Sequence, residues 1–501
     1  RLILALCFCT SFFIIYYFTY VDVHILPLVY IDRTAGDSIA LIVPSEFKRE
    51  VNEKDLEEKK SAENSSEEIK TEEKLSEEKE TEDNSPEITP TTQAIKVPYT
   101  SIFIYRAYYD DRSSNGTVRV LLMSRCIKEQ NFFQMRIGSE LQPMEQRPVE
   151  GSKCPWGWAP GCKWNAYALE SFPLGFRPKK VTIIVNGTRE VEVDVHRVHK
   201  VKKGRMQICV PPLFWYTDWP RMVLFFEMWK KHNPTFIIYA NSISSKVLQV
   251  LEHYQKQNLV QIVNWPLLPL GENGDDPNTS IYRLSHSLAH NDCVMRMRSE
   301  FGALVDIDEY LHLRNGQNLI DFAQEQLKIK ENLGSWSFTH HGLFIKPLDE
   351  TFEGIHTANV LKMKGPPKTF FRPDKVKFLS THFVGKFTEN VAHRSLRRSE
   401  GVLMHNRVQF GGLKPGDEVD LGENTPFTDV LLNSTLTVSH SIFGEDLPRY
   451  ENTSSVAMGN CMKRWRSQGC KVPLINCRAD MLPLDDWIFL PSTDDSNYTV
   501  V

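Results

Sequence analysis

The spacing of hydrophobic and polar positions changes along the chain, and each change predicts a different kind of structure. Between residues 97 and 203, short apolar runs alternate with polar positions, as in KKVTIIVNGT at 179–188. This alternation is typical of half-buried strands. Asn186-Gly187 separates two such runs and is a strong hairpin signal. We therefore expect a β-rich module over residues 97–204.

The pattern then alternates between strands and helices. Three apolar runs and two stretches of helical spacing follow one another: 206–210, 219–229, 235–240, 244–257 and 260–264. Apolar residues at three- and four-residue steps from Ile281 to Met295 predict a further helix, and an apolar run at 301–305 predicts the strand after it. Strands joined by single helices favour right-handed crossovers. The fold class predicted is α/β, with a mostly parallel sheet flanked by helices.

The strand at 301–305 ends in three acids among four residues, Asp306, Asp308 and Glu309. Burying carboxylates is costly, so we expect a cationic group to meet them. On a strand, the Cα atoms of Asp306 and Asp308 would be roughly 6–7 Å apart, so the chain should bend there. Carboxylate oxygens suit Mg²⁺ or Mn²⁺, which bridge phosphate oxygens. A D-x-D pair alone is a weak motif, and surface acids at a strand end are the alternative.

The first residues predict a membrane segment. Residues 2–18 form an uncharged apolar run, and Asp22 is the first charge after Arg1. We expect an uncleaved signal anchor over 1–21, because no small-x-small cleavage pattern follows the run; a cleaved signal peptide is the alternative. Residues 22–96 should form a stem that is disordered from about residue 46.

Charge supports this division. Residues 46–87 hold 17 acidic and 8 basic side chains, whereas the whole chain has a net charge of −4, so the remainder is mildly basic. That balance suits an anionic small molecule and is too weak to indicate nucleic-acid binding.

Cysteines and sequons indicate passage through the secretory pathway. Eight of the ten cysteines lie outside the apolar run, and we expect pairing between Cys154 and Cys162 and within the group Cys461, Cys470 and Cys477. A zinc site at that group is disfavoured, because no histidine stands beside it at ligand spacing. Besides Asn64, the N-x-S/T sequons that we expect to be glycosylated are Asn115, Asn186, Asn278, Asn433, Asn452 and Asn497.

Several spaced motifs between residues 200 and 410 resemble glycosyltransferase family 92. In chain order they are Cys209-Val-Pro-Pro, Ile237-Ile-Tyr-Ala, Val263-Asn-Trp-Pro, Asn291-Asp-Cys-Val-Met-Arg296, Val305-Asp-Ile-Asp-Glu-Tyr310, Phe371-Arg-Pro-Asp-Lys-Val376 with the later His382, and Leu403-Met-His-Asn-Arg407. The chain departs from the family at Asn406, where a tyrosine is usual.

The resemblance implies a GT-A fold over 205–415, followed by a cysteine-containing extension over 416–501. It also implies a UDP-sugar donor (UDP-galactose in the characterised members), Mn²⁺ and inversion at the anomeric carbon. Asp308 would bind the metal directly, Asp306 the ribose or a metal-bound water, and His382, or alternatively His405, would complete the metal site. The expected donor-binding residues are Pro211, Tyr239, Asp292, Arg296 and Asp306.

Inversion needs a general base, normally a carboxylate. Asp349, Glu350 and Glu353 are the candidates, and spacing does not select among them. The hypothesis is a single-pass type II Golgi galactosyltransferase that acts on glycoprotein or glycolipid glycans, for example on fucose or galactose of N-glycans. The alternatives are a transferase that uses another UDP-sugar and a non-catalytic lumenal glycan-binding protein with the same fold.

Overall fold

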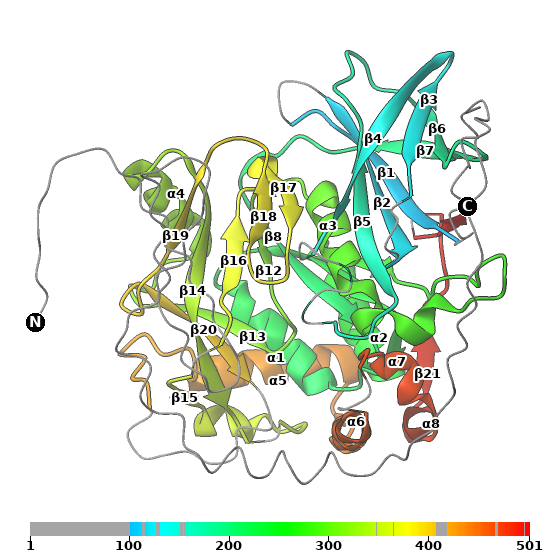
Figure 1. Cartoon of the computed structure of the whole chain (residues 1–501). Helices are drawn as coiled ribbons and strands as arrows, with labels where there is room; N and C mark the ends of the chain where they lie inside the picture. Colours follow the sequence, from blue (N-terminus) through cyan, green and yellow to red (C-terminus); the bar gives the residue numbers. More distant parts are fainter. Residues whose placement is uncertain are drawn as a thin grey trace, which may run out of the picture. The chain divides into compact units, whose positions relative to one another are not determined.

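Two large sheets form the framework of the described chain (Figure 1). The computed structural model describes residues 101–501 apart from 113–115, 127–130, 151–153, 155–156, 158, 347, 364, 407–417, 466–468 and 495. The expected anchor and stem, Asn64, Asn115 and Arg407 lie outside the described residues. Among the helices that are described, none is long and apolar enough to cross a membrane.

The first sheet is built mainly from the predicted β-rich region. Its strands are β1 (Phe103–Asp110), β2 (Thr117–Arg125), β3 (Phe133–Ile137), β4 (Glu140–Pro148), β5 (Trp164–Glu170), β6 (Lys180–Val185), β7 (Arg189–Arg197) and β22 (Thr499–Val500). Because β1 pairs with both β7 and β2, the sheet closes on itself. The predicted hairpin joins β6 to β7, and its turn residues Asn186 and Gly187 have φ values of 53° and 71°.

The second, central sheet begins with the predicted strand–helix alternation. The elements are β8 (Lys202–Leu213), α1 (Trp219–Lys230), β9 (Thr235–Ala240), α2 (Ser245–Lys256), β11 (Val260–Asn264), α3 (His286–Arg296) and β12 (Ser299–Leu304). The four strands pair in parallel in the order β11-β9-β8-β12, which confirms the prediction for this part. One detail was wrong: the strand predicted at 206–210 does not end before Pro211, because β8 continues to Leu213. The strand shifts register between Val210 and Leu213, which accommodates prolines that lack an N–H.

Beyond β12 the sheet is mixed, so the mostly parallel sheet was only partly right. It continues through β16 (Lys368–Phe371), β14 (Leu333–Phe344), β20 (Gly401–Asn406) and β13 (Glu309–Leu313). β16 is antiparallel to both neighbours, β14 is parallel to β20, and β20 is antiparallel to β13. Shorter strands extend this half or pair separately: β15 (Asn359–Leu361), β17 (Val376–Leu379), β18 (Val384–Phe387) and β19 (Ala392–Ser395).

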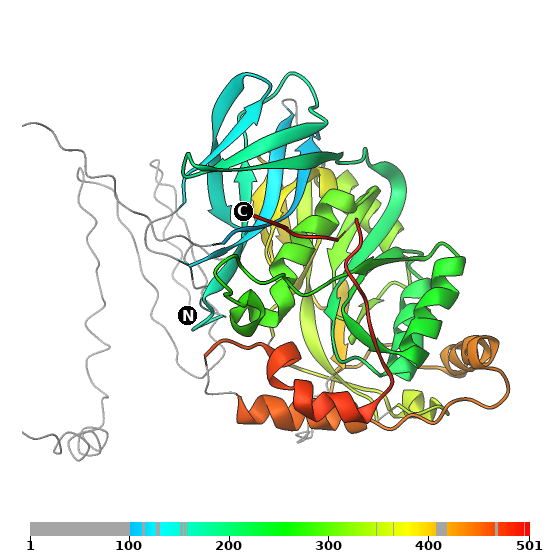
Figure 2. The same ribbon diagram turned by 90° about the vertical axis from the view of Figure 1, so that its right-hand side faces the viewer.

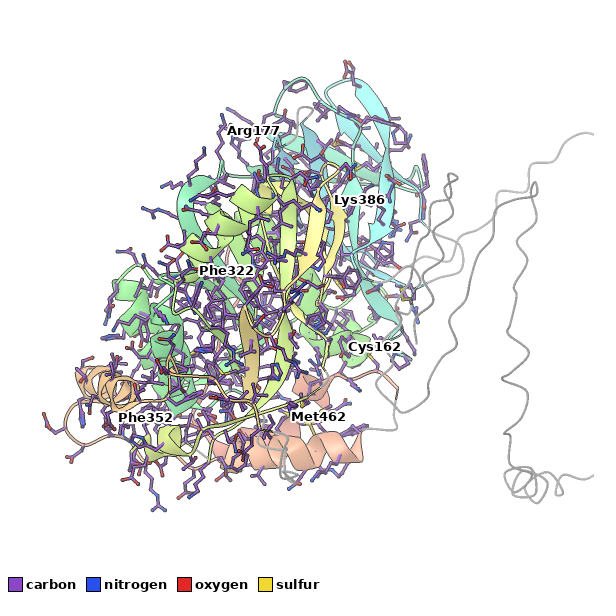
Figure 3. The ribbon with its side chains drawn as sticks, turned by 90° about the vertical axis from the view of Figure 1, so that its left-hand side faces the viewer. Cys162, Arg177, Phe322, Phe352, Lys386 and Met462 are labelled. Carbon is purple, nitrogen blue, oxygen red and sulfur yellow. A yellow bond between two sulfur atoms is a disulfide. The ribbon has the colours of Figure 1, made fainter. Side chains whose placement is uncertain are left out.

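Alternating side chains of the parallel strands feed two cores. Ile208 and Ile238 face a core with α1, α2, α4 (Leu319–Ile329) and α5 (Asp429–Phe443), whereas Ile237 and Tyr239 face a core with α3. Because both faces are covered, these strands appear in the sequence as continuous apolar runs. α3 lies between the central sheet and the first sheet (Figure 1). Figure 3 shows the side chains that fill the interior, among them Phe322 of α4, whose ring lies 5.7 Å from that of Phe338.

The C-terminal segment pairs with strands from earlier in the chain. It contains α6 (Thr453–Arg464), α7 (Pro473–Asn476), α8 (Arg478–Met481) and β21 (Trp487–Phe489), and β21 pairs with β10 (Ser242–Ser244). The final strand, β22, joins β1 (Figure 2).

Four disulfides join the described residues: Cys126–Cys154, Cys162–Cys470, Cys209–Cys293 and Cys461–Cys477. The predicted pair Cys154–Cys162 is wrong. Cys162 instead meets the C-terminal segment, where Gly161 packs so closely on Gly469 that a Cβ on Gly161 would lie 3.1 Å from the Cα of Gly469. Cys461–Cys477 lies within the predicted group, whereas Cys470 pairs outside it.

Candidate active site

The acidic residues after β12 form a tight turn. The Asp306 carbonyl accepts a hydrogen bond of 3.0 Å from the Glu309 N–H, and Glu309 then begins β13. The predicted bend is thereby confirmed. The side chains of Asp306 and Asp308 are 36% and 25% exposed, whereas that of Glu309 is 1% exposed. Two carboxylates can therefore be reached from solvent, and the third lies behind them.

Lys368 is the cation that the sequence led us to expect. β16 pairs with β12, and this places Lys368 at the end of β12, where its Nζ lies 2.9 Å from Asp306 Oδ2 and 3.5 Å from Glu309 Oε2. Its side chain is only 5% exposed. Burial disfavours ionisation of Asp306, but the nearby ammonium outweighs it and holds the pKa of Asp306 well below its usual range. Asp306 is thus already neutralised by a protein cation.

Asp308 faces a histidine instead. β20 pairs with β13 and sets His405 opposite Glu309. His405 Nε2 lies 3.2 Å from Asp308 Oδ2, and the Asn406 N–H donates to the Asp308 carbonyl at 2.8 Å. Burial opposes ionisation of Asp308, yet His405 shifts its pKa below the usual value. The histidine against Asp308 is thus His405, the alternative, while Nδ1 of His382 lies 3.3 Å from the Pro367 carbonyl.

Glu309, His340 and His405 form a buried group whose ligand atoms lie within 4.8 Å of one another, so the group could hold a metal ion. Burial first, and then the charge of Asp306, raise the pKa of Glu309 to about 7. The sequence analysis did not single out His340. The signal available was the His340-His341 doublet beside the apolar Leu343 and Phe344, since two adjacent histidines are unusual at buried positions.

Two further histidines, His286 and His290, lie on α3, with ring centroids 5.1 Å apart. Burial is the main cause that lowers both pKa values, that of His290 to about 3, so both rings are neutral at pH 7. The turn before α3 is strained, because Arg283, Leu284 and Ser285 have φ values of 44°, 53° and 60°. Arg283 is exposed, and its charge also favours the ionised form of Asp306.

Three of the expected donor-binding residues, Tyr239, Asp292 and Arg296, bond to one another. Tyr239 Oη donates to Asp292 Oδ2 at 2.6 Å, Arg296 Nε donates to the same oxygen at 2.6 Å, and Tyr108 donates to Asp292 Oδ1. Asp292 is fully buried. These contacts join β1, β9 and α3, so the structure gives the group a bracing role and does not bring it to the acidic turn. Pro211, which was also expected at the donor site, lies within β8.

The three candidate general bases are not brought together with the acids by any described contact. Asp349 Oδ1 accepts hydrogen bonds from the Thr351 N–H and hydroxyl, at 3.0 and 2.6 Å. Glu350 Oε2 accepts from the Tyr450 N–H at 3.0 Å, and Glu353 is exposed in a short 3₁₀ helix, Glu353–Thr357. The geometry selects none of them as the base.

The sequons differ in how accessible their amides are. Asn433 and Asn497 are exposed, and Asn452 and Asn186 are half-buried. Asn278 is 7% exposed; its amide nitrogen donates to the Leu268 carbonyl at 2.8 Å, and its oxygen accepts from the Leu268 N–H at 2.9 Å. The same nitrogen also donates to Asp276 Oδ1 at 2.8 Å, and an attached glycan would replace one of these two buried hydrogens, so glycosylation of Asn278 does not fit the folded chain.

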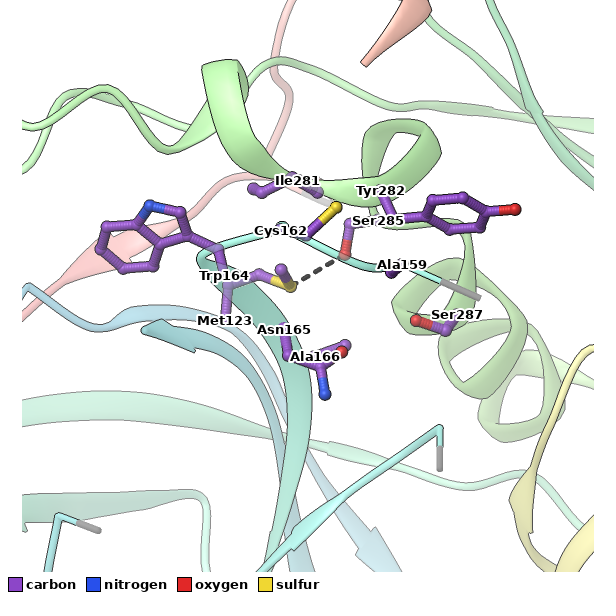
Figure 4. Close-up of a pocket in the computed structure, with 10 residues that line it drawn as sticks. All are labelled: Met123, Ala159, Cys162, Trp164, Asn165, Ala166, Ile281, Tyr282, Ser285 and Ser287. Atoms are coloured by element: carbon purple, nitrogen blue, oxygen red, sulfur yellow. Dashed lines mark hydrogen bonds between the residues drawn. The ribbon is translucent and has the colours of Figure 1, made fainter. Parts of the chain in front are cut away.

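A small pocket of about 320 Å³, including its open mouth, lies elsewhere, between β5 and the start of α3 (Figure 4). Trp164, Ile281 and Tyr282 contribute to its lining, and Ser285 Oγ donates to Met123 Sδ across it at 2.8 Å. The acidic turn does not line it. The candidate site is therefore the exposed edge formed by Asp306 and Asp308.

Comparison with known proteins identifies the same part of the chain. The family model of glycosyltransferase family 92 matches residues 204–429, which include the acidic turn, Lys368 and His405. Over these residues, which are less than half of the chain, the sequence is similar to glycosyltransferase family 92. The glycosyltransferase family 92 protein F13G3.3 of Caenorhabditis elegans is 24% identical over 246 residues, which are 47% of this chain. The match spans about half (48%) of the length of that curated relative.

Solved structures are more distant from this chain. TarS residues 1–349 of S. aureus in complex with UDP-GlcNAc is 10% identical, with a TM-score of 0.24, over 56% of this chain and 80% of that one. A putative glucose-1-phosphate thymidylyltransferase from Bacillus anthracis in complex with a sucrose is 10% identical, with a TM-score of 0.22, over 49% and 98% of the two chains. Scores this low do not establish a shared fold.

Proposed function

We propose that this family 92 glycosyltransferase has a GT-A fold and is a metal-dependent, inverting enzyme that transfers galactose from UDP-galactose to a glycan. The observation that carries the proposal is the pairing of Asp308 with His405 at a solvent-reachable strand end. A carboxylate oxygen and an imidazole nitrogen 3.2 Å apart suit one divalent ion, since both are ligands of Mn²⁺-type metals.

The residues of the turn would have separate tasks. Asp308 and His405 would hold the ion, and Asp306, bound to Lys368, would stay ionised beside the ribose or a metal-bound water. The ion would supply positive charge that stabilises the departing diphosphate. Arg283 and Lys368 add cations around the same carboxylates, which suits an anionic donor.

A donor screen tests this function. The purified full chain is incubated with Mn²⁺, a panel of UDP-sugars and a glycan array, beside Asp308→Ala and a version treated with EDTA. We expect galactose transfer from UDP-galactose that is lost in both controls. Transfer from another UDP-sugar would correct the donor, and a chain that binds glycans without using any donor would support the lumenal binding protein.

We also propose a type II Golgi membrane location, with the anchor over 1–21 and the stem over 22–96. Four disulfides and two exposed sequons are consistent with a lumenal body. Protease protection in sealed microsomes should shield residues 101–501. An N-terminus processed near residue 20–30 would exclude the anchor.

A further inference from the structure

Three side chains behind the acidic turn form a cluster that the central sheet builds. β20 lies between β13 and β14, so Glu309 is opposite His405 on one side, and His340 comes from the strand on the other. Glu309, His340 and His405 are 0%, 6% and 2% exposed. Their arrangement is therefore fixed by strand register and burial.

The ring of His405 has a neighbour at each nitrogen. Nε2 lies 3.2 Å from Asp308 Oδ2, and Nδ1 lies 3.0 Å from Nε2 of His340. The ring centroids lie 4.9 Å apart, and the interplanar angle is 31°. An imidazole that binds a metal through one nitrogen carries its proton on the other, and that N–H needs an acceptor. Nε2 of His340 is placed to accept it.

Glu309 lies beside both histidines, at distances longer than the His405–His340 hydrogen bond. Its Oε1 lies 3.6 Å from Nδ1 of His405 and 3.8 Å from Nε2 of His340, and among the described residues it has no hydrogen-bond partner. Its Oε2 is used by the Asp306 N–H at 2.8 Å and by Lys368. The carboxyl group thus connects the turn to the two histidines.

His340 is itself held in place. A Cβ on Gly365 would lie 2.3 Å from Nδ1 of His340, so the chain passes the ring at a distance that only glycine permits. The next residue, His341, is equally buried, but its Nδ1 lies 3.3 Å from the Leu361 carbonyl. His341 therefore offers a matched control on the same strand.

We infer that His340 is a positioning residue that fixes the ring of His405, so that His405 presents the lone pair of Nε2 beside Asp308 to a divalent metal ion. This inference rests on the proposed metal-dependent function. The same cluster could instead enclose an ion, because its atom separations of 3.0, 3.6 and 3.8 Å are near the ~3.3 Å edge of a tetrahedral zinc site. Lys368, 3.5 Å from Glu309 Oε2, opposes a second cation there.

Manganese binding to the full chain, measured without donor from the EPR signal of free Mn²⁺, tests the inference. We expect His340→Ala to weaken Mn²⁺ binding about 10- to 100-fold, as for other partners of metal ligands. His340→Gln should recover most of the affinity, since its amide oxygen can replace Nε2 as the acceptor. His341→Ala should bind Mn²⁺ like the wild type, and Asp308→Ala should abolish binding.

Three results would overturn the inference. They are wild-type affinity in His340→Ala, equal losses in His340→Ala and His341→Ala, and retention of Mn²⁺ by Asp308→Ala when His340→Ala loses it, which would place the ion inside the cluster. Transfer assays on the same preparations separate the two proposals. Mn²⁺ binding that depends on His340 without any sugar transfer contradicts only the proposed function, whereas transfer with unchanged Mn²⁺ affinity in His340→Ala contradicts only this inference.

Discussion

Asp306 and Asp308 of the acidic turn differ in whether their carboxylates remain available to an added metal ion. Asp306 is bonded to the Lys368 ammonium, whereas Asp308 faces the imidazole of His405, which can be uncharged. An ion that approaches the turn therefore meets one carboxylate that already has a cation and one that does not. This asymmetry supports Asp308 as the direct metal ligand.

Replacing Lys368 by methionine should lower the free energy of unfolding by about 2–3 kcal/mol. The change leaves Glu309 and Asp306 without their cation; breaking a fully buried pair costs about 3–5 kcal/mol, and the 36% exposure of Asp306 reduces that figure. Urea unfolding with EDTA present measures it. Adding Glu309→Gln should restore part of the loss, and a double variant no more stable than Lys368→Met would contradict the assigned pairing.

Glu309 predicts a pH dependence. Its pKa, raised by burial to about 7, lies above the value near 4.3 of an unfolded glutamate. Between these pH values the folded state binds more protons, so the contribution of Glu309 to stability falls as the pH rises. With EDTA present, Glu309→Gln should gain stability relative to the wild type between pH 5 and pH 8. If Glu309→Gln and the wild type differ in stability by the same amount at pH 5 and at pH 8, burial does not dominate the pKa of Glu309.

The sequence predicted part of this site. Asp306 and Asp308 stand out because they end an apolar run, and the need for a cation followed from the cost of burying acids. Lys368, Glu309 and His340 were not assigned as functional residues, and His405 ranked below His382. Their roles depend on pairing between strands that are distant in sequence, β16 with β12 and β20 with β13, which local periodicity does not reveal.

At the scale of elements, the four predicted at 219–229, 235–240, 244–257 and 260–264 match the structure to within one residue at each end, whereas β8 is longer than predicted and α3 begins later. Each has a single period and ends at a turn or proline signal, so local pattern suffices. The mixed half of the sheet was missed because β14 is a 12-residue, mostly buried strand with polar residues among its apolar ones, and it has four strand neighbours in different directions. No local rule sets those directions.

The disulfide between Cys209 and Cys293 ties β8 to α3 across 84 residues. The Cys461–Cys477 disulfide closes a loop of only 16 residues. The loss of chain entropy that a disulfide imposes on the unfolded state increases with loop length. Removing Cys209–Cys293 by two alanine substitutions should therefore lower the free energy of unfolding by about 1.5 kcal/mol more than removing Cys461–Cys477 in the same way. Thermal or urea unfolding of the two double variants compares them. Equal losses would indicate that native packing, and not chain entropy, dominates.

The bracing role of Tyr239 separates stability from donor binding. Tyr239→Phe removes the hydrogen bond to the fully buried Asp292 and should cost roughly 1.5–3 kcal/mol of unfolding free energy, the range for bonds to charged groups. The dissociation constant for UDP should stay unchanged. Weaker UDP binding without a loss of stability would return Tyr239 to the donor site.

At the scale of the molecule, the C-terminal segment is part of the framework that holds the site. It adds β22 to the first sheet, β21 to β10 and Cys470 to Cys162. α3, which precedes the acidic strand, packs against both large sheets. The described residues 101–501 belong to one compact unit, so these C-terminal contacts and the acidic turn are parts of the same folded body.

The central claim is that Asp308 and His405 form a metal-dependent site for a UDP-sugar. Calorimetric titration of UDP into the full chain, with Mn²⁺ or with EDTA, tests it most directly, beside Asp308→Asn and the exposed control Asp194→Asn. We predict that UDP binds at least about tenfold more tightly with Mn²⁺, a difference of roughly 1.4 kcal/mol or more, and that Asp308→Asn abolishes this difference while Asp194→Asn keeps it. UDP affinity that is independent of Mn²⁺, or a full Mn²⁺ effect in Asp308→Asn, would contradict the account.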